Sequence, residues 1–141
     1  MSELTNLFIS PETKQELNLI NNELISADKK YKYEIEDDIF KFVSKNNIET
    51  KTNSVRDFYL DYSFPNYNDF DTLEMFVKKM SNNLFIKELT QIINPKNKVL
   101  EFGCGTGQLG NYLAATGYSQ IISADLSINS LKLANNFKKK N

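Results

Sequence analysis

The chain has 141 residues, 40% of them hydrophobic and 12% aromatic, which is enough apolar surface for packed cores and excludes a disordered chain. Seventeen Lys and Arg against eighteen Asp and Glu leave a net charge of -1, so charge does not support nucleic-acid binding. With one cysteine and no histidine, an intrachain disulfide and the usual zinc ligand sets are excluded. We expect a cytoplasmic protein that does not enter a membrane, because no apolar run approaches the roughly 20 residues of a membrane helix.

Residues 1–45 are expected to form a small β-rich module. Short apolar clusters alternate with turn-forming residues in this region, and Asn21-Asn22 is typical of a hairpin turn. Tyr31, Tyr33 and Ile35 then recur at period two, as on one face of a half-buried strand. Since no metal ligand set is present, we expect this module to fold without zinc and to rely on apolar packing.

Residues 46–94 are expected to contain a linker and two lead-in helices. Polar and turn-forming residues fill residues 46–72, and a helical pattern follows, with Asp71 or Thr72 as its N-cap. A second helical pattern ends before Pro95. The apolar positions that define the two helices are Leu73, Phe76, Val77 and Met80 in the first, and Phe85, Leu89, Ile92 and Ile93 in the second.

Residues 95–141 alternate between strand and helix patterns. We expect strands at 98–102 and 120–124, and helices at 108–115 and 127–139, the last with Ser127 as its N-cap. Short connections between these elements imply a right-handed βαβ crossover and therefore a parallel strand pair. This is the first βαβα unit of a doubly wound α/β fold.

A glycine-rich turn joins the first of these strands to its helix. Three glycines at alternate positions let the backbone leave the strand sharply and approach a ligand without interference from Cβ atoms. Asp125 ends the second strand eighteen residues beyond Gly107, where a carboxylate can accept both hydroxyls of a ribose. The turn reads Glu101-Phe102-Gly103-Cys104-Gly105-Thr106-Gly107.

Two cofactor patterns overlap in this turn. Residues 105–110 match the dinucleotide pattern G-x-G-x-x-G, and residues 101–107 match an acid-x-G-x-G-x-G pattern. The dinucleotide interpretation would place Glu101 inside a buried strand. Burying an unpaired carboxylate there would cost on the order of several kcal/mol. The second pattern suits S-adenosylmethionine instead. This molecule is cationic and has no pyrophosphate, so an acidic turn favours it over a dinucleotide.

Residues 97–137 resemble motif I and the second-strand acid of class I S-adenosylmethionine-dependent methyltransferases. The resemblance rests on Val99 to Gly107 and on Asp125-Leu126-Ser127. It implies a truncated Rossmann-like methyltransferase domain whose cofactor is S-adenosyl-L-methionine; the methyl acceptor and the catalytic residues stay unknown. The implied cofactor-binding residues are Glu101, Phe102, Gly103, Cys104, Gly105, Thr106, Gly107, Asp125 and Leu126.

Residues 7–43 resemble a Trm112-like zinc-ribbon module, through Pro11 and the stretch 33–39. Where such modules carry two C-x-x-C knuckles, this chain has residues 10–13 and 26–29, which contain no cysteine. The resemblance therefore implies a relative that has lost its zinc ligands.

A class I methyltransferase sheet typically has seven strands, of which this sequence supplies two. We therefore expect a fragment that is inactive alone, or a chain whose sheet is completed by a partner chain or by a missing C-terminal half. Two other functions stay open: a non-catalytic interaction module and an NAD-dependent oxidoreductase. Cys104 is read as a small packing residue rather than a nucleophile, because no histidine can activate it. Tyr67 is read as a linker residue that packs on the domain rather than a cofactor contact.

Overall fold

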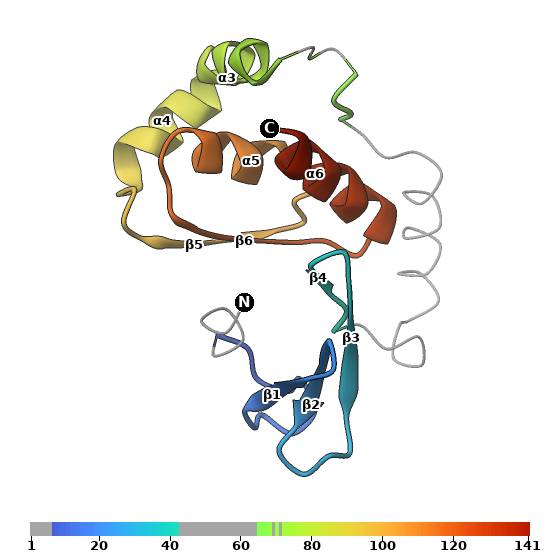
Figure 1. The fold of residues 1–141 in the computed structure, drawn as a ribbon. Helices are drawn as coiled ribbons and strands as arrows, with labels where there is room; N and C mark the ends of the chain where they lie inside the picture. Colours follow the sequence, from blue (N-terminus) through green and yellow to red (C-terminus); the bar gives the residue numbers. More distant parts are fainter. Residues whose placement is uncertain (1–6, 43–64, 69, 71) are drawn as a thin grey trace, which may run out of the picture. The chain divides into compact units, whose positions relative to one another are not determined.

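The computed structural model describes residues 7–42, 65–68, 70 and 72–141. The chain divides into two compact units, Met1–Ile48 and Glu49–Asn141. The described residues form a mixed α/β structure with four helices, a four-stranded antiparallel sheet and a two-stranded parallel sheet (Figure 1). Most of the linker expected at residues 46–72 lies outside the described residues.

The first unit is an antiparallel meander of β1 (Leu17–Ile20), β2 (Glu23–Ser26), β3 (Lys32–Glu36) and β4 (Ile39–Phe40). The expected hairpin turn at Asn21 and Asn22 is confirmed, with φ angles of 49° and 64° between β1 and β2. Asparagine tolerates this left-handed conformation better than most residues do. The expected alternation holds for Tyr33 and Ile35, which are buried. It is wrong for Tyr31, which precedes β3 and is exposed in the turn where its carbonyl accepts from the Ser26 amide.

Apolar side chains on one side of this meander make its core. Leu17, Leu24, Tyr33 and Ile35 are buried together, and three phenylalanines pack against them. Two of these ring pairs have centroids 5.0 and 5.2 Å apart, within the range in which aromatic pairs attract. The phenylalanines are Phe8, Phe40 and Phe42.

Buried hydrogen bonds stabilise the turns at residues 10–13 and 26–29, where the sequence led us to expect apolar packing alone. Ser10 and Ser26 are 0% and 1% exposed. The Ser10 hydroxyl lies 2.8 Å from the Tyr33 hydroxyl, which donates to the Glu12 carboxylate. The Ser26 hydroxyl donates to the Asp28 carboxylate at 2.6 Å. A buried hydroxyl needs such partners, so these clusters stabilise both turns without a metal.

The second unit contains α3 (Leu73–Ser81), α4 (Leu84–Ile92), β5 (Lys98–Phe102), α5 (Gln108–Ala115), β6 (Gln120–Ala124) and α6 (Ile128–Lys140). The parallel pairing of β5 with β6, expected from the sequence, is confirmed, with a register that runs from Lys98–Gln120 to Phe102–Ala124. Thr72 and Ser127 are the N-caps of α3 and α6, as expected, and each side chain accepts from a backbone amide three residues on.

Helices α5 and α6 lie on the same side of the β5–β6 pair (Figure 1). The core between them includes Tyr112, Leu113 and Phe137. Helix α4 is oriented differently from our expectation, since Phe85 and Ile92 are 65% and 80% exposed. Its buried position is Ile86, because Ile86, Leu89, Thr90 and Ile93 form the helical stripe that faces the core.

The opposite face of the parallel pair carries exposed apolar side chains. Leu100 and Phe102 of β5 are 56% and 80% exposed, whereas Val99 and Glu101 point to the helix side and are half-buried. Parallel sheets are normally covered on both faces, so this face is one that another polypeptide segment would stabilise. Within the described part of the chain, no helix has the length and apolar character needed to span a membrane.

The hydrogen-bonded turns of the first unit predict a metal-independent fold. Purified protein should contain no stoichiometric zinc in metal analysis, and EDTA should leave its thermal unfolding unchanged, because among the described residues no group of His, Cys, Asp and Glu can hold a metal ion. In contrast, Tyr33→Phe should lower the unfolding free energy of this unit by roughly 1 to 3 kcal/mol, as it removes hydrogen bonds to a buried hydroxyl and a carboxylate. Zinc at one equivalent, or loss of structure in EDTA, would contradict this account.

Candidate functional site

The glycine turn has a left-handed backbone at alternate residues. Gly103, Gly105 and Gly107 have φ angles of 66°, 54° and 69°, which residues with a Cβ atom rarely adopt. The Cys104 amide donates to the Ala124 carbonyl at 3.1 Å, so the turn extends the pairing between the ends of β5 and β6. The turn therefore lies at the carboxyl ends of both parallel strands, where ligands of doubly wound sheets bind.

Two glycines at the start of α5 are required for close packing. A Cβ atom at Gly107 would lie 2.8 Å from the Cβ of Ala134 on α6. A Cβ atom at Gly110 would collide with the Ser123 hydroxyl and approach the Glu101 carboxylate to 3.1 Å. Gly110, the last glycine of the dinucleotide pattern, thus has a steric role inside the unit that involves no ligand.

The Glu101 carboxylate lies beneath the start of α5. It accepts from the Ser123 hydroxyl at 3.0 Å and lies close to Gly110, the third residue of the helix. Gly107 at the N-cap has no side chain that could make a capping hydrogen bond. Burial raises the pKa of Glu101, and the nearby Asp125 carboxylate adds to this effect.

Asp125 connects the glycine turn to the beginning of α6. One carboxylate oxygen accepts from the Gly105 amide and the other accepts from the Ser127 amide, both at 2.8 Å. Ser127, and not Asp125, is the N-cap of α6. Each carboxylate oxygen has a second lone pair, so the side chain keeps capacity to accept from ribose hydroxyls.

The other predicted site residues occupy different environments. Phe102 and Leu126 are exposed, at 80% and 47%, beside the turn. Thr106 is fully buried. Burial raises the pKa of the Cys104 thiol to about 12, with the carboxylates of Glu101 and Asp125 adding to it, so this side chain stays protonated at neutral pH. This protonation state agrees with a packing role for Cys104.

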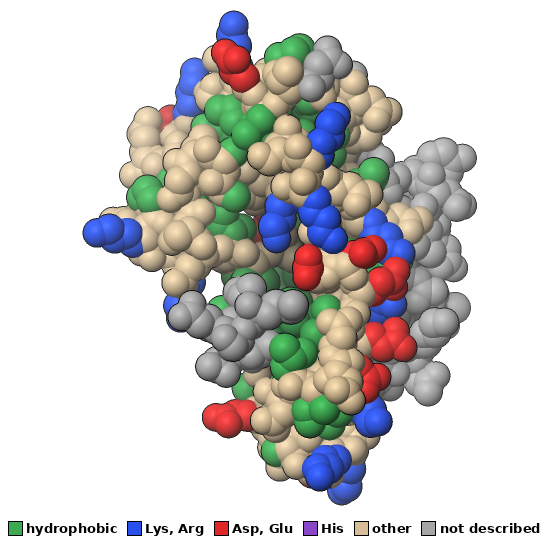
Figure 2. Space-filling view, in the orientation of Figure 1, with side chains coloured by type: hydrophobic (Ala, Val, Ile, Leu, Met, Phe, Trp, Pro, Cys, Tyr) green, Lys and Arg blue, Asp and Glu red, His purple; other side chains and the backbone are tan. Residues whose placement is uncertain are grey.

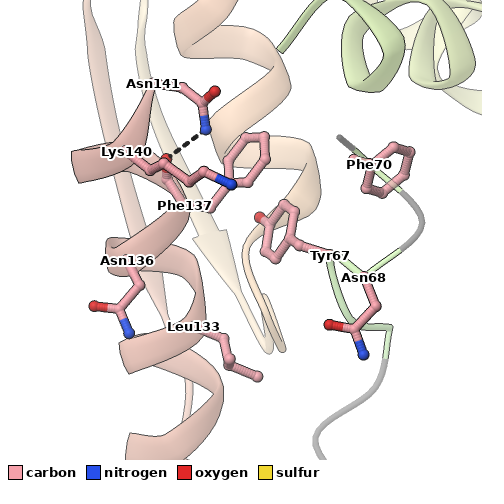
Figure 3. Close-up of a pocket in the computed structure, with 8 residues that line it drawn as sticks. All are labelled: Tyr67, Asn68, Phe70, Leu133, Asn136, Phe137, Lys140 and Asn141. Carbon is pink, nitrogen blue, oxygen red and sulfur yellow. Dashed lines mark hydrogen bonds between the residues drawn. The ribbon is translucent and has the colours of Figure 1, made fainter. Parts of the chain in front are cut away.

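Tyr67 links the segment before α3 to the glycine turn. Its hydroxyl donates to the Thr106 carbonyl at 2.9 Å and accepts from the Asn111 amide at 2.7 Å. Its ring stacks on Phe137 of α6, with centroids 4.1 Å apart, as the close-up shows (Figure 3). Burial raises the pKa of Tyr67 to about 12. Tyr67 therefore belongs to the interior of the second unit, as the packing interpretation expected.

The two residues before Tyr67 make further contacts with the turn and with α5. The buried Thr106 hydroxyl donates to the Pro65 carbonyl, and the Gln108 side chain donates to the Asn66 carbonyl at 2.9 Å. The segment 65–67 thus makes hydrogen bonds to the region from the glycine turn to Asn111 with each of its three residues.

Two hollows lie near this segment in the second unit. The first, about 240 Å³, lies between Tyr67, Phe70 and α6 (Figure 3). The second, about 640 Å³, lies between the α3–α4 turn, Gln108 and four residues before α3, which are Pro65, Asn66, Asn68 and Phe70. Residues 101–107 and Asp125 line neither hollow. In open parallel sheets, ligands bind in a crevice outside the carboxyl ends of the strands, which need not be a closed cavity. We therefore define the candidate site by the strand ends and not by a hollow.

Sequence reasoning missed two residues that organise this site. Ser123 pairs in register with Glu101 across the parallel strands, and the available signal was a hydroxyl that follows two isoleucines in the strand. Asn111 donates to Tyr67 and to the Ala134 carbonyl, which joins the segment, α5 and α6. Nothing in the sequence pattern distinguishes Asn111 from a surface residue of a helix.

No protein-family model, curated protein or solved structure matches this chain. The geometry of the glycine turn and of the two carboxylates is therefore what bears on function.

Tyr67→Phe should destabilise the second unit. The change removes one hydrogen bond to the Thr106 carbonyl and one from Asn111 while it keeps the stacked ring, and two such bonds contribute roughly 1 to 3 kcal/mol together. Denaturant unfolding followed by signals of α5 and α6 measures this loss. Tyr31→Phe is the matched control. It removes an exposed tyrosine hydroxyl, which makes no hydrogen bond to another described residue. Equal effects of the two changes would contradict a structural role for the Tyr67 hydroxyl.

Glu101→Gln should change how stability depends on pH. The folded-state pKa of Glu101 lies above 4.5, so the folded chain holds this proton more tightly than the unfolded chain does. The unfolding free energy that this group contributes is therefore present at low pH and is lost as pH rises through the folded pKa. Relative to wild type, Glu101→Gln should gain stability as pH rises from the unfolded-state pKa through the raised folded-state pKa of Glu101, measured in parallel unfolding titrations. A pH-independent difference between the two proteins would disprove the buried position of the carboxylate.

Proposed function

We propose that the second unit is the first part of a Rossmann-like, S-adenosylmethionine-dependent methyltransferase domain. The observation that carries the proposal is the pair of carboxylates at the glycine turn. Glu101 accepts from the Ser123 hydroxyl close to the start of α5, and Asp125 accepts from Gly105 within the turn. Both negative charges lie at the strand ends, where a cofactor of such a domain binds.

The residues present suit a cationic nucleoside. Asp125 would accept the ribose hydroxyls, Glu101 would attract the ammonium group of the methionine part, and the exposed Leu126 would contact the adenine. When bound, S-adenosylmethionine supplies an activated methyl group on a sulfonium. The chain's own part is to hold and orient the cofactor, since positioning is the main contribution to such a transfer.

A dinucleotide suits this turn less well. A pyrophosphate binds a helix N-terminus through free amides and the positive end of the helix dipole. Here the carboxylate of Glu101 lies close to the first turn of α5, and a second carboxylate, Asp125, accepts from the Gly105 amide. The sequence argument against a dinucleotide assumed that Glu101 would be unpaired. A hydrogen bond from Ser123 pairs it, so the argument against a dinucleotide is now electrostatic.

An interaction module is the second candidate, and the exposed sheet face favours it. Leu100 and Phe102 present apolar surface that a parallel sheet normally covers. We propose that further strands and helices, in a longer chain or a partner chain, cover this face, and that the 141 residues alone do not transfer methyl groups.

Equilibrium binding separates the functions. A methyltransferase domain should bind S-adenosylhomocysteine and not NADH, whereas a pure interaction module should bind neither.

The first unit is proposed to be a metal-free relative of the Trm112-like module, supported by the buried hydroxyls at both knuckle positions. A reduced Cys104 fits a cytoplasmic protein. Nucleic acid is not the favoured acceptor, because the net charge of the chain is -1, and the face shown in Figure 2 carries Asp and Glu as well as Lys and Arg.

Asp125→Ala should weaken binding of S-adenosylhomocysteine by about 10- to 150-fold, the equivalent of losing charge-assisted hydrogen bonds of about 1.5 to 3 kcal/mol. Asp125→Asn keeps one acceptor and should fall between wild type and Ala. Chemical-shift titrations of the labelled chain measure these constants even where binding is weak.

A pair of nucleosides separates the ribose contact from the support that Asp125 gives to Gly105. If Asp125 binds the ribose, adenosine should lose affinity in Asp125→Ala, whereas 2′,3′-dideoxyadenosine should bind wild type and variant alike. Equal losses for both nucleosides would show that Asp125 acts only through the turn, and unchanged binding of both would remove its assigned role.

A further inference from the structure

The pairing of the two parallel strands places one hydroxyl beside the Glu101 carboxylate. Ser123 of β6 is the register partner of Glu101 of β5, and its hydroxyl donates to the carboxylate at 3.0 Å. Because a shift of register would move every side chain of a strand, the pairing of the whole ladder fixes these two residues opposite each other. The backbone, and not only the side-chain conformation, therefore holds the hydroxyl beside the carboxylate.

Helix α5 encloses the same pair from the other side. A Cβ atom at Gly110 would collide with the Ser123 hydroxyl and lie 3.1 Å from Oε2 of Glu101, the oxygen that accepts from Ser123. With β6 on one side and α5 on the other, this oxygen has little room to move. Glu101 as a whole is only half-buried, so a ligand can still reach its carboxylate.

The Ser123 hydroxyl also favours the ionised form of Glu101. Burial raises the pKa of Glu101, the hydrogen bond from Ser123 lowers it, and the Asp125 carboxylate raises it. A hydroxyl donates more strongly to a carboxylate than to a neutral carboxyl group, which is why the bond from Ser123 acts against burial. A carboxylate has about four lone-pair sites, so Glu101 can accept from Ser123 and from an ammonium group together.

We infer that Ser123 is a positioning residue of the proposed cofactor site, which holds the Glu101 carboxylate oriented and ionised for the ammonium group of the methionine part. This inference rests on the proposed methyltransferase function. Ser123 acts only through Glu101, so its effect is specific to ligands that carry the ammonium group.

Other ionisable side chains act on Glu101 or lie on the elements around it. Burial raises the pKa of Cys104 and of Tyr67 to about 12, so both stay protonated at the pH at which a carboxylate titrates. Strand β6 carries no ionisable side chain, and α5 carries one tyrosine. The ionisable side chains are Tyr67 before α3, Cys104 in the turn, Tyr112 on α5 and Asp125 after β6.

Two ligands separate the inferred role from a structural one. S-adenosylhomocysteine carries the ammonium group, whereas 5′-methylthioadenosine keeps the adenosine and the thioether and lacks the amino-acid part. NMR titrations of the ¹⁵N-labelled chain over a range of pH, read at the amides of residues 103–107, give both dissociation constants. The affinity for S-adenosylhomocysteine relative to 5′-methylthioadenosine should increase as pH rises through the pKa of Glu101, because only the ionised carboxylate attracts the ammonium group. Titration of Asp125 affects both ligands, since both carry the ribose.

Ser123→Ala should weaken binding of S-adenosylhomocysteine about fivefold on the acidic side of this midpoint, as loss of a hydrogen bond to a charged group does. It should also move the midpoint to higher pH, because the bond that lowers the pKa of Glu101 is lost. Binding of 5′-methylthioadenosine should not change. Ser123→Thr keeps the hydroxyl and should restore the midpoint. A loss of affinity that is equal for both ligands, or equal at every pH, would overturn the inference.

The ¹³C signal of the Glu101 carboxyl group in the ligand-free chain distinguishes this inference from the function on which it rests. Its titration should move to higher pH in Ser123→Ala and not in Ser123→Thr. Binding of S-adenosylhomocysteine with the same pH dependence in wild type and Ser123→Ala rejects the role of Ser123 and keeps the methyltransferase. A Glu101 titration that moves in Ser123→Ala, with no binding of either ligand, rejects the methyltransferase and overturns the cofactor role of Ser123 with it.

Discussion

The structure of the second unit depends on how the backbone amides of a glycine-rich turn find acceptors. A turn of alternating left-handed glycines exposes its amides, and the N-cap of the following helix has no side chain with which to help. A carboxylate from the end of the second strand meets part of this need, since Asp125 accepts from the Gly105 amide, and the Glu101 carboxylate lies close to Gly110 at the start of α5. The parallel pairing of β5 and β6 is what brings these two residues to the same turn. The geometry of the turn and the start of the helix therefore depend on the register of the two strands.

This coupling extends to a segment distant in sequence. Pro65, Asn66 and Tyr67 each share a hydrogen bond with the turn or with α5, and Tyr67 also stacks on Phe137 of α6. Such contacts order a turn that has no regular secondary structure, because each hydrogen bond and each buried ring offsets part of the conformational entropy that the loop loses on folding. The segment before α3 is thus part of the same unit as the strands, and changes in it should be felt at the candidate site.

Local patterns predicted the elements of this unit well, because its strands and helices are short, bounded by clear caps and patterned with one period each. Thr72 and Ser127 illustrate this, since an N-cap is a local signal. The orientation of α4 was not predictable, since Phe85 and Ile86 are equally apolar and only tertiary contacts choose between them. The position of Glu101 was not predictable either: its sequence neighbours suggest a ligand contact, whereas its hydrogen-bond partner Ser123 and its neighbour Gly110 come from other elements. In the first unit, the buried hydroxyls at Ser10 and Ser26 depend on Tyr33 and Asp28, pairings that a search for cysteines does not reveal.

The carboxylate pair also connects stability with ligand choice. Burial and the neighbouring Asp125 both disfavour the charged form of Glu101, as its raised pKa records, so the folded chain carries an unfavourable electrostatic interaction at the strand ends. A cation bound beside the two carboxylates would reduce that interaction, whereas an anion would increase it. A ligand that binds only the folded state stabilises that state in proportion to its occupancy. Two carboxylates at the strand ends thus agree with the proposed cationic cofactor, because on electrostatic grounds a pyrophosphate beside them would be disfavoured.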